Sequence, residues 1–234
     1  MRDDAKQHQF KNAAEQHILP AGDFSFWLRN ARNSLLSDNG TDVACGECIA
    51  CCSSYQFISI RPEEILTLNA IRRDLLVSAP GRPKGHVLLG YDKKGYCPMM
   101  QNNACSIYEH RPLTCRTYDC RMFSAAGMTT GYETTVRIFE RVRQWEFSYP
   151  SNLDRAEHEA MKAAAKFIRE HASCFPGGGI PRSSGQLAVL AIKVYKVFLK
   201  EDGEAMPEGC ILSNAEIADA IVEACKRFDA GRGA

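Results

Sequence analysis

Apolar side chains recur every three to four residues in several segments, a spacing that predicts α-helices with one buried face. Two of these segments also carry a capping box, a serine followed three residues later by an acid: Ser151 with Asp154, and Ser213 with Glu216. The pattern predicts helices over residues 24–36, 62–76, 132–147, 152–171, 186–200 and 214–228. Helices are also expected over the polar residues 5–17 and, after Pro112, over residues 113–123.

Two short segments have the character of strands instead. Residues 55–60 alternate and are rich in aromatic and β-branched side chains, and residues 87–89 form a short apolar run. Proline, glycine and asparagine interrupt the chain between residues 97 and 120, which predicts mostly irregular structure there, with a tight turn at residues 108–112.

Cysteines are concentrated in one part of the chain. Eight of the eleven lie in two sets between residues 45 and 120. CxxC is a common spacing for two sulfurs that bind one ion, and CxxCxxC also occurs in the segments that hold iron–sulfur clusters. We therefore predict that these eight are metal ligands: Cys45, Cys48, Cys51 and Cys52 in the first set, and Cys97, Cys105, Cys115 and Cys120 in the second.

The adjacent pair Cys51 and Cys52 bears on the number of metal centres. Neighbouring side chains usually diverge, whereas sulfurs that share a zinc ion lie roughly 3.8 Å apart, given Zn–S bonds of about 2.3 Å. Eight sulfurs also divide into two four-cysteine sites. The sequence thus favours two centres, or one polynuclear cluster with additional thiolates, and leaves open which cysteine serves which centre.

Basic residues accompany the second cysteine set. Four thiolates around a zinc ion leave a net charge of −2, which a nearby cation would stabilise. Arg111, Arg116 and Arg121 lie close to Cys115 and Cys120 in sequence, and Arg116 is the one we favour for contact with the metal site. We interpret His110 as a turn residue, not a ligand.

Overall charge adds few constraints. The chain has 29 basic and 28 acidic residues and no basic run, so neither nucleic acid nor an anionic membrane is expected as a partner.

The N-terminus lacks the apolar region of a secretory signal, and no segment reaches the ~18–20 apolar residues of a membrane span. We expect a cytoplasmic protein, in which clustered cysteines more often bind metal than form disulfides.

The cysteine segment resembles a known family. The strings CGECIACC, ISIRPEEILTL and YCPMMQNNACSIYEHRPLTCRTYDCR, over residues 45–122, are similar to the YkgJ-type cysteine-cluster proteins. The resemblance implies that the segment chelates zinc or iron. In the case of iron, the implied forms include an iron–sulfur cluster of the [4Fe-4S] type. Flagellin lysine methylases have a similar cysteine cluster, but this chain has no glycine-rich loop for a methyl donor.

Together these features predict the fold class. We expect a mainly α protein with short strands and irregular metal-binding loops, in which helices flank a cysteine-rich metal-binding core. Three regions are predicted: an N-terminal helical segment (1–40), a cysteine-cluster domain (41–125) and a C-terminal helical region that packs on it (126–234).

Motifs for ordinary catalysis are lacking. His158 and Glu159 begin like a zinc-protease HExxH, but Lys162 occupies the position of the second histidine, and no P-loop or GxSxG occurs. We therefore expect a metal-binding protein, and the sequence leaves open whether it is also an enzyme. Two alternatives remain open: an iron–sulfur redox enzyme or electron carrier, and a metal-stabilised module that binds a protein partner.

Overall fold

The computed structural model describes residues 18–37, 40, 43, 47–55, 57–130, 135–181, 183–200, 205 and 212–231. The helix predicted over residues 5–17 and the cysteines Cys45 and Cys210 lie outside these residues. Helices dominate the described part of the chain and the strands are short, which confirms the mainly α prediction.

The elements follow one another without an internal repeat in the described residues. The α-helices there are α1 (Phe24–Ser37), α2 (Ile65–Ala70), α3 (Leu113–Thr117), α4 (Arg121–Ala125), α5 (Val136–Val142), α6 (Asn152–Glu170), α7 (Ser184–Val194) and α8 (Asn214–Ala230). The strands are β1 (Leu19–Asp23), β2 (Phe57–Ile60), β3 (Leu76–Ser78), β4 (Val87–Gly90), β5 (Met100–Gln101), β6 (Ala104–Cys105) and β7 (Trp145–Ser148).

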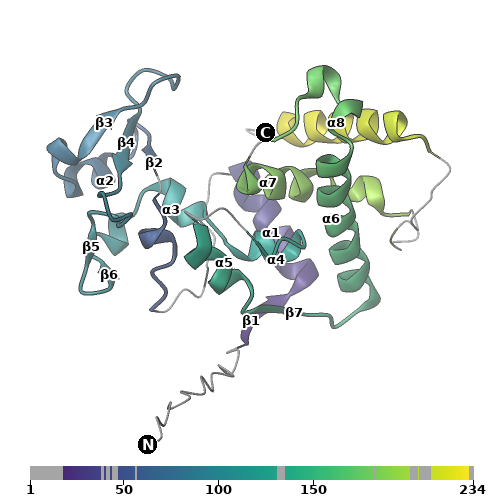
Figure 1. The fold of residues 1–234 in the computed structure, drawn as a ribbon, viewed down its shortest axis with the longest axis horizontal. Helices are drawn as coiled ribbons and strands as arrows, with labels where there is room; N and C mark the ends of the chain where they lie inside the picture. Colours follow the sequence, from purple (N-terminus) through teal and green to yellow (C-terminus); the bar gives the residue numbers. More distant parts are fainter. Residues whose placement is uncertain are drawn as a thin grey trace, which may run out of the picture.

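One part of the molecule, which we call the helical body, consists of β1, α1 and the described residues from 120 onward. Its helices α1, α6 and α7 pack on one another, and α8 packs on α7 (Figure 1). Strand β1 pairs in parallel with β7, so the two ends of a long stretch of chain meet here. The core of the body is apolar and includes the fully buried side chains of Phe24, Leu28, Ile138, Met161 and Ile168.

A second part, which we call the sheet lobe, spans residues 57–117 and lies beside the helical body (Figure 1). Its three-stranded antiparallel sheet has the order β2-β4-β3. The lobe has a core of its own, formed by Ile58, Ile60, Ile71, Leu89 and Met99. The described part of the chain therefore has two hydrophobic cores, and the cysteine segment connects them.

The helix predicted over residues 62–76 is wrong for most of its length. The α-helix is confined to α2, because Ile71 adopts an extended backbone (φ −110°, ψ 132°) and buries its side chain in the lobe core. A short 3₁₀ helix, η2 (Arg73–Leu75), follows. Leu76 then begins β3, which pairs with β4. Sheet pairing and burial across the lobe outweigh the helical spacing of the apolar residues in this segment.

The helix predicted over residues 132–147 is also partly wrong. Helix α5 ends at Val142, and β7 follows with Trp145 and Phe147 buried and Glu146 and Ser148 exposed. This alternation has the period of a strand, and β1 provides the pairing partner. The helix predicted over residues 113–123 is split into α3 and α4, because Tyr118 is extended (φ −78°, ψ 114°).

Both predicted capping boxes are confirmed, at the N-termini of α6 and α8. The predicted helix over residues 24–36 is confirmed as α1, and it packs on α6. The boundaries at residues 40 and 125 remain predictions. No helix in the described part of the chain is both long enough and apolar enough to cross a bilayer.

Candidate metal centre

A cavity of about 340 Å³ lies where the sheet lobe meets the helical body. Both predicted cysteine sets contribute to its lining, as do apolar side chains such as Ile58, Leu89 and Ile138. The structure thus brings together every predicted ligand that it describes: Cys48, Cys51, Cys52, Cys97, Cys105, Cys115 and Cys120.

Backbone hydrogen bonds fasten the first cysteine set to the lobe. The N–H of Cys97 donates to the carbonyl oxygen of Cys52 at 2.7 Å. The hydroxyl of Tyr91, just after β4, donates to the carbonyl oxygen of Cys51 at 2.9 Å. Because both bonds go to carbonyl oxygens of the main chain, they position this part of the CxxCxxCC segment beside the lobe.

A tight hairpin presents Cys105. Strands β5 and β6 pair Met100 with Cys105, and the two residues between the strands, Asn102 and Asn103, have φ of 49° and 58°. Positive φ at both positions is typical of a type I′ turn, which asparagine tolerates better than most residues. The N–H of Met100 donates to the carbonyl oxygen of Cys97, so the hairpin holds Cys97 and Cys105 in the same part of the lobe.

The start of α3 is fixed to the lobe and carries Cys115 with it. A carboxylate oxygen of Glu64 accepts the N–H of Leu113 at 2.6 Å, and the hydroxyl of Thr114 donates to the carbonyl oxygen of Ser59 at 2.7 Å. Glu64 therefore satisfies an N–H at the start of α3 that has no acceptor within the helix.

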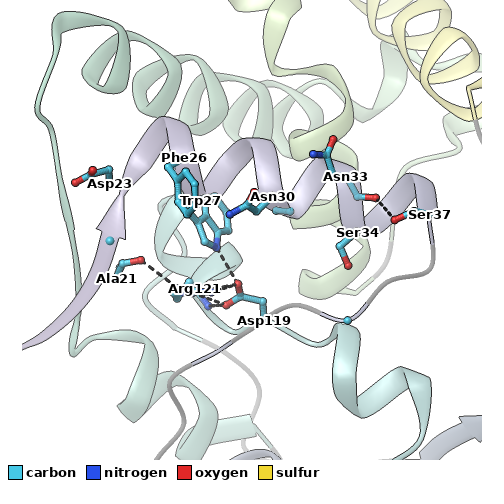
Figure 2. Close-up of a pocket in the computed structure, with 13 residues that line it drawn as sticks. Ala21, Asp23, Phe26, Trp27, Asn30, Asn33, Ser34, Ser37, Asp119 and Arg121 are labelled. Atoms are coloured by element: carbon cyan, nitrogen blue, oxygen red, sulfur yellow. Dashed lines mark hydrogen bonds and ion pairs between the residues drawn. The ribbon is translucent and has the colours of Figure 1, made fainter.

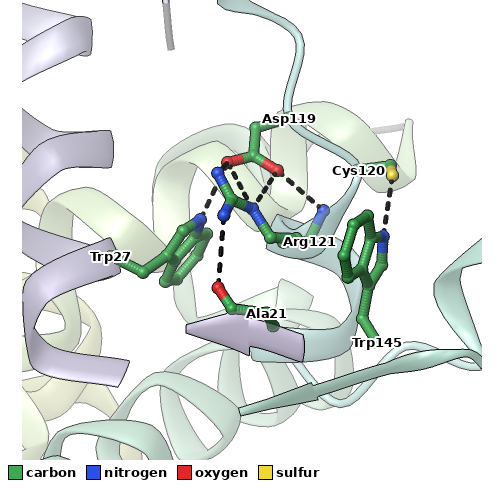
Figure 3. A network of polar contacts seen from close by, with 6 residues as sticks. All are labelled: Ala21, Trp27, Asp119, Cys120, Arg121 and Trp145. Carbon is green, nitrogen blue, oxygen red and sulfur yellow. Dashed lines mark hydrogen bonds and ion pairs between the residues drawn. The ribbon is translucent and has the colours of Figure 1, made fainter. Parts of the chain in front are cut away.

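Cys120 is the most buried of these cysteines, and its sulfur has a donor. The indole N–H of Trp145 reaches the sulfur of Cys120 at 3.1 Å (Figure 3). The guanidinium of Arg141 lies 4.9 Å from the centre of the Trp145 ring, and both residues line the cavity. Trp145 and Arg141 are cavity residues that the sequence analysis missed.

The three candidate arginines occupy different environments. Arg111 lines the cavity, whereas Arg116 is exposed and is not part of the lining, so its role at the metal site remains a prediction. Arg121 pairs with Asp119 at 2.8 Å and donates to the carbonyl oxygen of Ala21 (Figure 3). Arg121 thus ties the cysteine segment to β1.

Burial controls the protonation of the lobe thiols. Burial, and after it the neighbouring thiolates of Cys52, Cys97 and Cys105, raise the pKa of Cys115 to about 12, while Arg111 opposes them. Burial also raises the pKa of Cys97. Because the thiolate is the form that binds metal, an ion that enters this cavity must displace protons.

The donors fit zinc or iron in kind. Soft thiolates select zinc and iron–sulfur centres over hard cations. The volume of the cavity is many times larger than the volume of about 10–15 Å³ that one water molecule needs. Within the described residues, no three His, Cys, Asp or Glu side chains already stand close enough together to hold an ion. Binding must therefore draw thiols toward one another from the cavity wall.

A second cavity, of about 530 Å³, lies along α1 (Figure 2). The described residues that line it include no cysteine, and its buried carboxylate, Asp119, accepts hydrogen bonds from the indole N–H of Trp27 and from Arg121. We interpret this carboxylate as structural. His158, the histidine of the incomplete HExxH, is also a core residue, stacked on Phe24 with ring centroids 4.3 Å apart.

Comparison with known proteins bears on the cysteine segment. A search of curated proteins and a search of solved structures both found no match to the chain. Residues 44–148 match the family model described as "CxxCxxCC: Putative zinc- or iron-chelating domain", which supports metal binding by this segment. The match runs beyond the cysteines through β7 and so includes Arg141 and Trp145. It confirms the resemblance seen in the sequence: residues 44–148 are similar to the CxxCxxCC family.

Proposed function

We propose that this chain is a metal-binding protein that holds zinc or iron in the cysteine cavity through the eight cysteines of its two sets. One observation carries the proposal: seven of those cysteines, drawn from both sets, line a single cavity. The cysteines that lie outside the two sets and are described, Cys174 and Cys225, do not line it.

The residues around the cavity suit anionic sulfur. The Trp145 N–H points at the sulfur of Cys120, and Arg111 and Arg141 place positive charge in the wall. Zinc bound by four thiolates would stabilise the fold, and an iron–sulfur cluster would carry electrons. Eight thiolates exceed the four that one zinc ion takes, so we favour more than one centre or a polynuclear cluster.

An iron–sulfur electron carrier is the second candidate, and one feature favours it. The cavity wall is largely apolar and includes an N–H···S hydrogen bond, and burial and hydrogen bonds to sulfur set the reduction potential of such clusters. A bound cluster would lose visible absorbance on reduction by dithionite and regain it on reoxidation.

Anaerobic purification followed by an absorption spectrum and analysis of metal and sulfide tests the proposal. Iron with sulfide and a broad visible band supports a cluster, and a colourless protein with zinc supports zinc centres. A chain that contains no metal, and takes up neither zinc nor iron with sulfide on reconstitution, would overturn the proposal.

Cysteine variants locate the site. We expect Cys48→Ser and Cys115→Ser to lower the metal content, because each removes a cavity thiol from a different set. Cys174→Ser is the matched control, since Cys174 lies in the 3₁₀ helix η5 (Ala172–Cys174), outside the cavity lining. Full metal content in both cavity variants would show that the metal binds elsewhere.

A further inference from the structure

The two hydrophobic cores divide the cavity cysteines into groups that differ from the two sets in the sequence. Cys97, Cys105 and Cys115 pack against the core of the sheet lobe. Cys48 and Cys51 pack against the core of the helical body, of which buried Cys120 is a member. Cys120 thus follows the lobe cysteines in sequence but belongs to the body in space.

Cys52 separates from its neighbour Cys51 and joins the lobe group. Its carbonyl oxygen accepts the N–H of Cys97 at 2.7 Å, which brings the two main chains into direct contact. Cys51 and Cys52 are the first two residues of the 3₁₀ helix η1 (Cys51–Ser53), where successive side chains point in directions about 120° apart. With Cys51 packed on the body core, the Cys52 side chain is directed elsewhere.

We propose that the lobe group is one four-thiolate metal centre and that the body group serves a second, separate centre. The lobe group is Cys52, Cys97, Cys105 and Cys115, and the described members of the body group are Cys48, Cys51 and Cys120. This assignment rests on the proposed function, metal binding in the cysteine cavity, and it adds the identity of the ligands at each centre.

The assignment accounts for two features of the sequence. A tetrahedral ion cannot easily take both sulfurs of an adjacent pair, and here Cys51 and Cys52 serve different centres. Four thiols also suffice to complete the coordination of one zinc ion, so the lobe centre needs no ligand from the helical body. The two centres would lie on opposite sides of one cavity, one on each core.

Pairs of substitutions test the grouping by whether their effects add. The reduced, metal-free protein is titrated with Zn²⁺, and bound metal is counted after removal of the excess. We expect Cys52→Ser and Cys105→Ser each to lower the bound zinc by half, and the double variant to lose no more than either one. The double variant that combines Cys52→Ser with Cys120→Ser should lose nearly all of the bound zinc. Cys174→Ser should bind as much zinc as the unmodified chain.

Thiol protection in the unmodified chain gives a second test that does not depend on the folding of variants. Mass spectrometry after alkylation at increasing zinc follows each cysteine. We expect the four lobe thiols to become protected over one range of zinc, together, and the body thiols over another. Protection of all described cavity thiols in one step, or a non-additive effect of the Cys52 and Cys120 substitutions, would overturn the grouping.

The two proposals fail in different ways. If the unmodified chain binds no metal, the proposed function itself is wrong. If it binds metal but the thiols do not divide as stated, metal binding stands and only the assignment of ligands is wrong.

Discussion

A single indole N–H reaches the cysteine cavity from a strand that carries no cysteine. Trp145 lies in β7, and its N–H donates to the sulfur of Cys120 at 3.1 Å. A hydrogen bond to a sulfur favours the thiolate over the thiol and offsets the cost of burying its charge. Trp145 is therefore a positioning residue for one thiolate of the site.

We expect Trp145→Phe to weaken metal binding about 10- to 100-fold, the usual range for loss of a partner of a metal ligand. An aromatic ring remains in the core, but the N–H is lost together with the pyrrole part of the indole. A competition titration of the variant with a chelator of known affinity measures the change.

Trp27→Phe is the matched control, because the N–H of Trp27 donates to Asp119 and not to a sulfur. It should lower the free energy of unfolding but leave the metal affinity within a few-fold of that of the unmodified chain. Equal losses of affinity in the two variants would show that tryptophan packing, and not the N–H···S bond, is responsible.

His158 predicts a specific dependence of stability on pH. Burial, and then the charge of Lys162, lower its pKa from 6.5 to about 4. As the pH falls, the unfolded chain takes up the proton first, so the free energy of unfolding decreases between about pH 6.5 and pH 4. The full loss is about 3 kcal/mol, reached once the pH is below the folded pKa.

Urea denaturation at a series of pH values checks this for the unmodified chain and for His158→Phe. The variant keeps an aromatic ring against Phe24 but cannot titrate, so its stability should vary less over that range. Parallel curves for the two proteins would show that other groups cause the pH dependence.

At the scale of residues, spacing alone predicted the cavity cysteines. Thiolates that bind the same metal usually lie close to one another in sequence, and this spacing is visible without a structure. Trp145 could not be predicted in this way. Its contact with Cys120 depends on where β7 lies, and β7 is placed by pairing with β1, far away in the chain. The lobe and body groups of cysteines likewise follow from two cores that no local pattern reveals.

Among the elements, two helix starts share one carboxylate. Asp154 completes the capping box of α6, where it accepts from Ser151, and its other carboxylate oxygen accepts the N–H of Ser25 in the first turn of α1 at 2.9 Å. Asp154 is buried, so its loss would leave buried N–H groups without an acceptor.

We expect Asp154→Ala to lower the free energy of unfolding by about 2–3 kcal/mol, since it removes a charged acceptor from two helices at once. Glu216→Ala in the exposed capping box of α8 is the matched comparison and should cost clearly less. Urea midpoints for both variants measure this, and a larger loss in Glu216→Ala would contradict the role given to Asp154.

The sequence predicted the elements of the helical body better than those of the sheet lobe. The helices α1, α6 and α8 are long enough to show a clear stripe, and two of them have caps that mark their starts. In the lobe, α2 is short and is followed directly by strands, so tertiary pairing decides its end. The alternation in β7 was visible in the sequence, but the preceding helical residues obscured it.

On the scale of the whole molecule, the cysteine cavity is the junction between two cores of unequal size. The sheet lobe has a small core, whereas the helical body has a much larger one. A metal bound in the cavity would therefore stabilise the lobe more than the body, because the lobe has fewer buried apolar contacts of its own.

We expect removal of metal by a chelator to increase amide hydrogen exchange in β2, β3, β4 and the β5–β6 hairpin. Exchange in the centre of α6 should stay nearly unchanged. Hydrogen-exchange mass spectrometry of the metal-loaded and stripped chain measures both, and a uniform increase across α6 and the lobe would contradict the separation into two cores.

The pairing of β1 with β7 also has a consequence for the order of events during synthesis. Every cysteine of the two sets leaves the ribosome before β7 does. Strand β1 therefore cannot pair until β7 has been synthesised, and the whole sheet lobe lies between the two strands in the sequence. Closing so long a loop is entropically unfavourable, and a cross-link inside the loop shortens it. A metal taken up early by the emerging cysteines would thus bring the two strands together sooner, and the supply of metal would set how fast the chain matures.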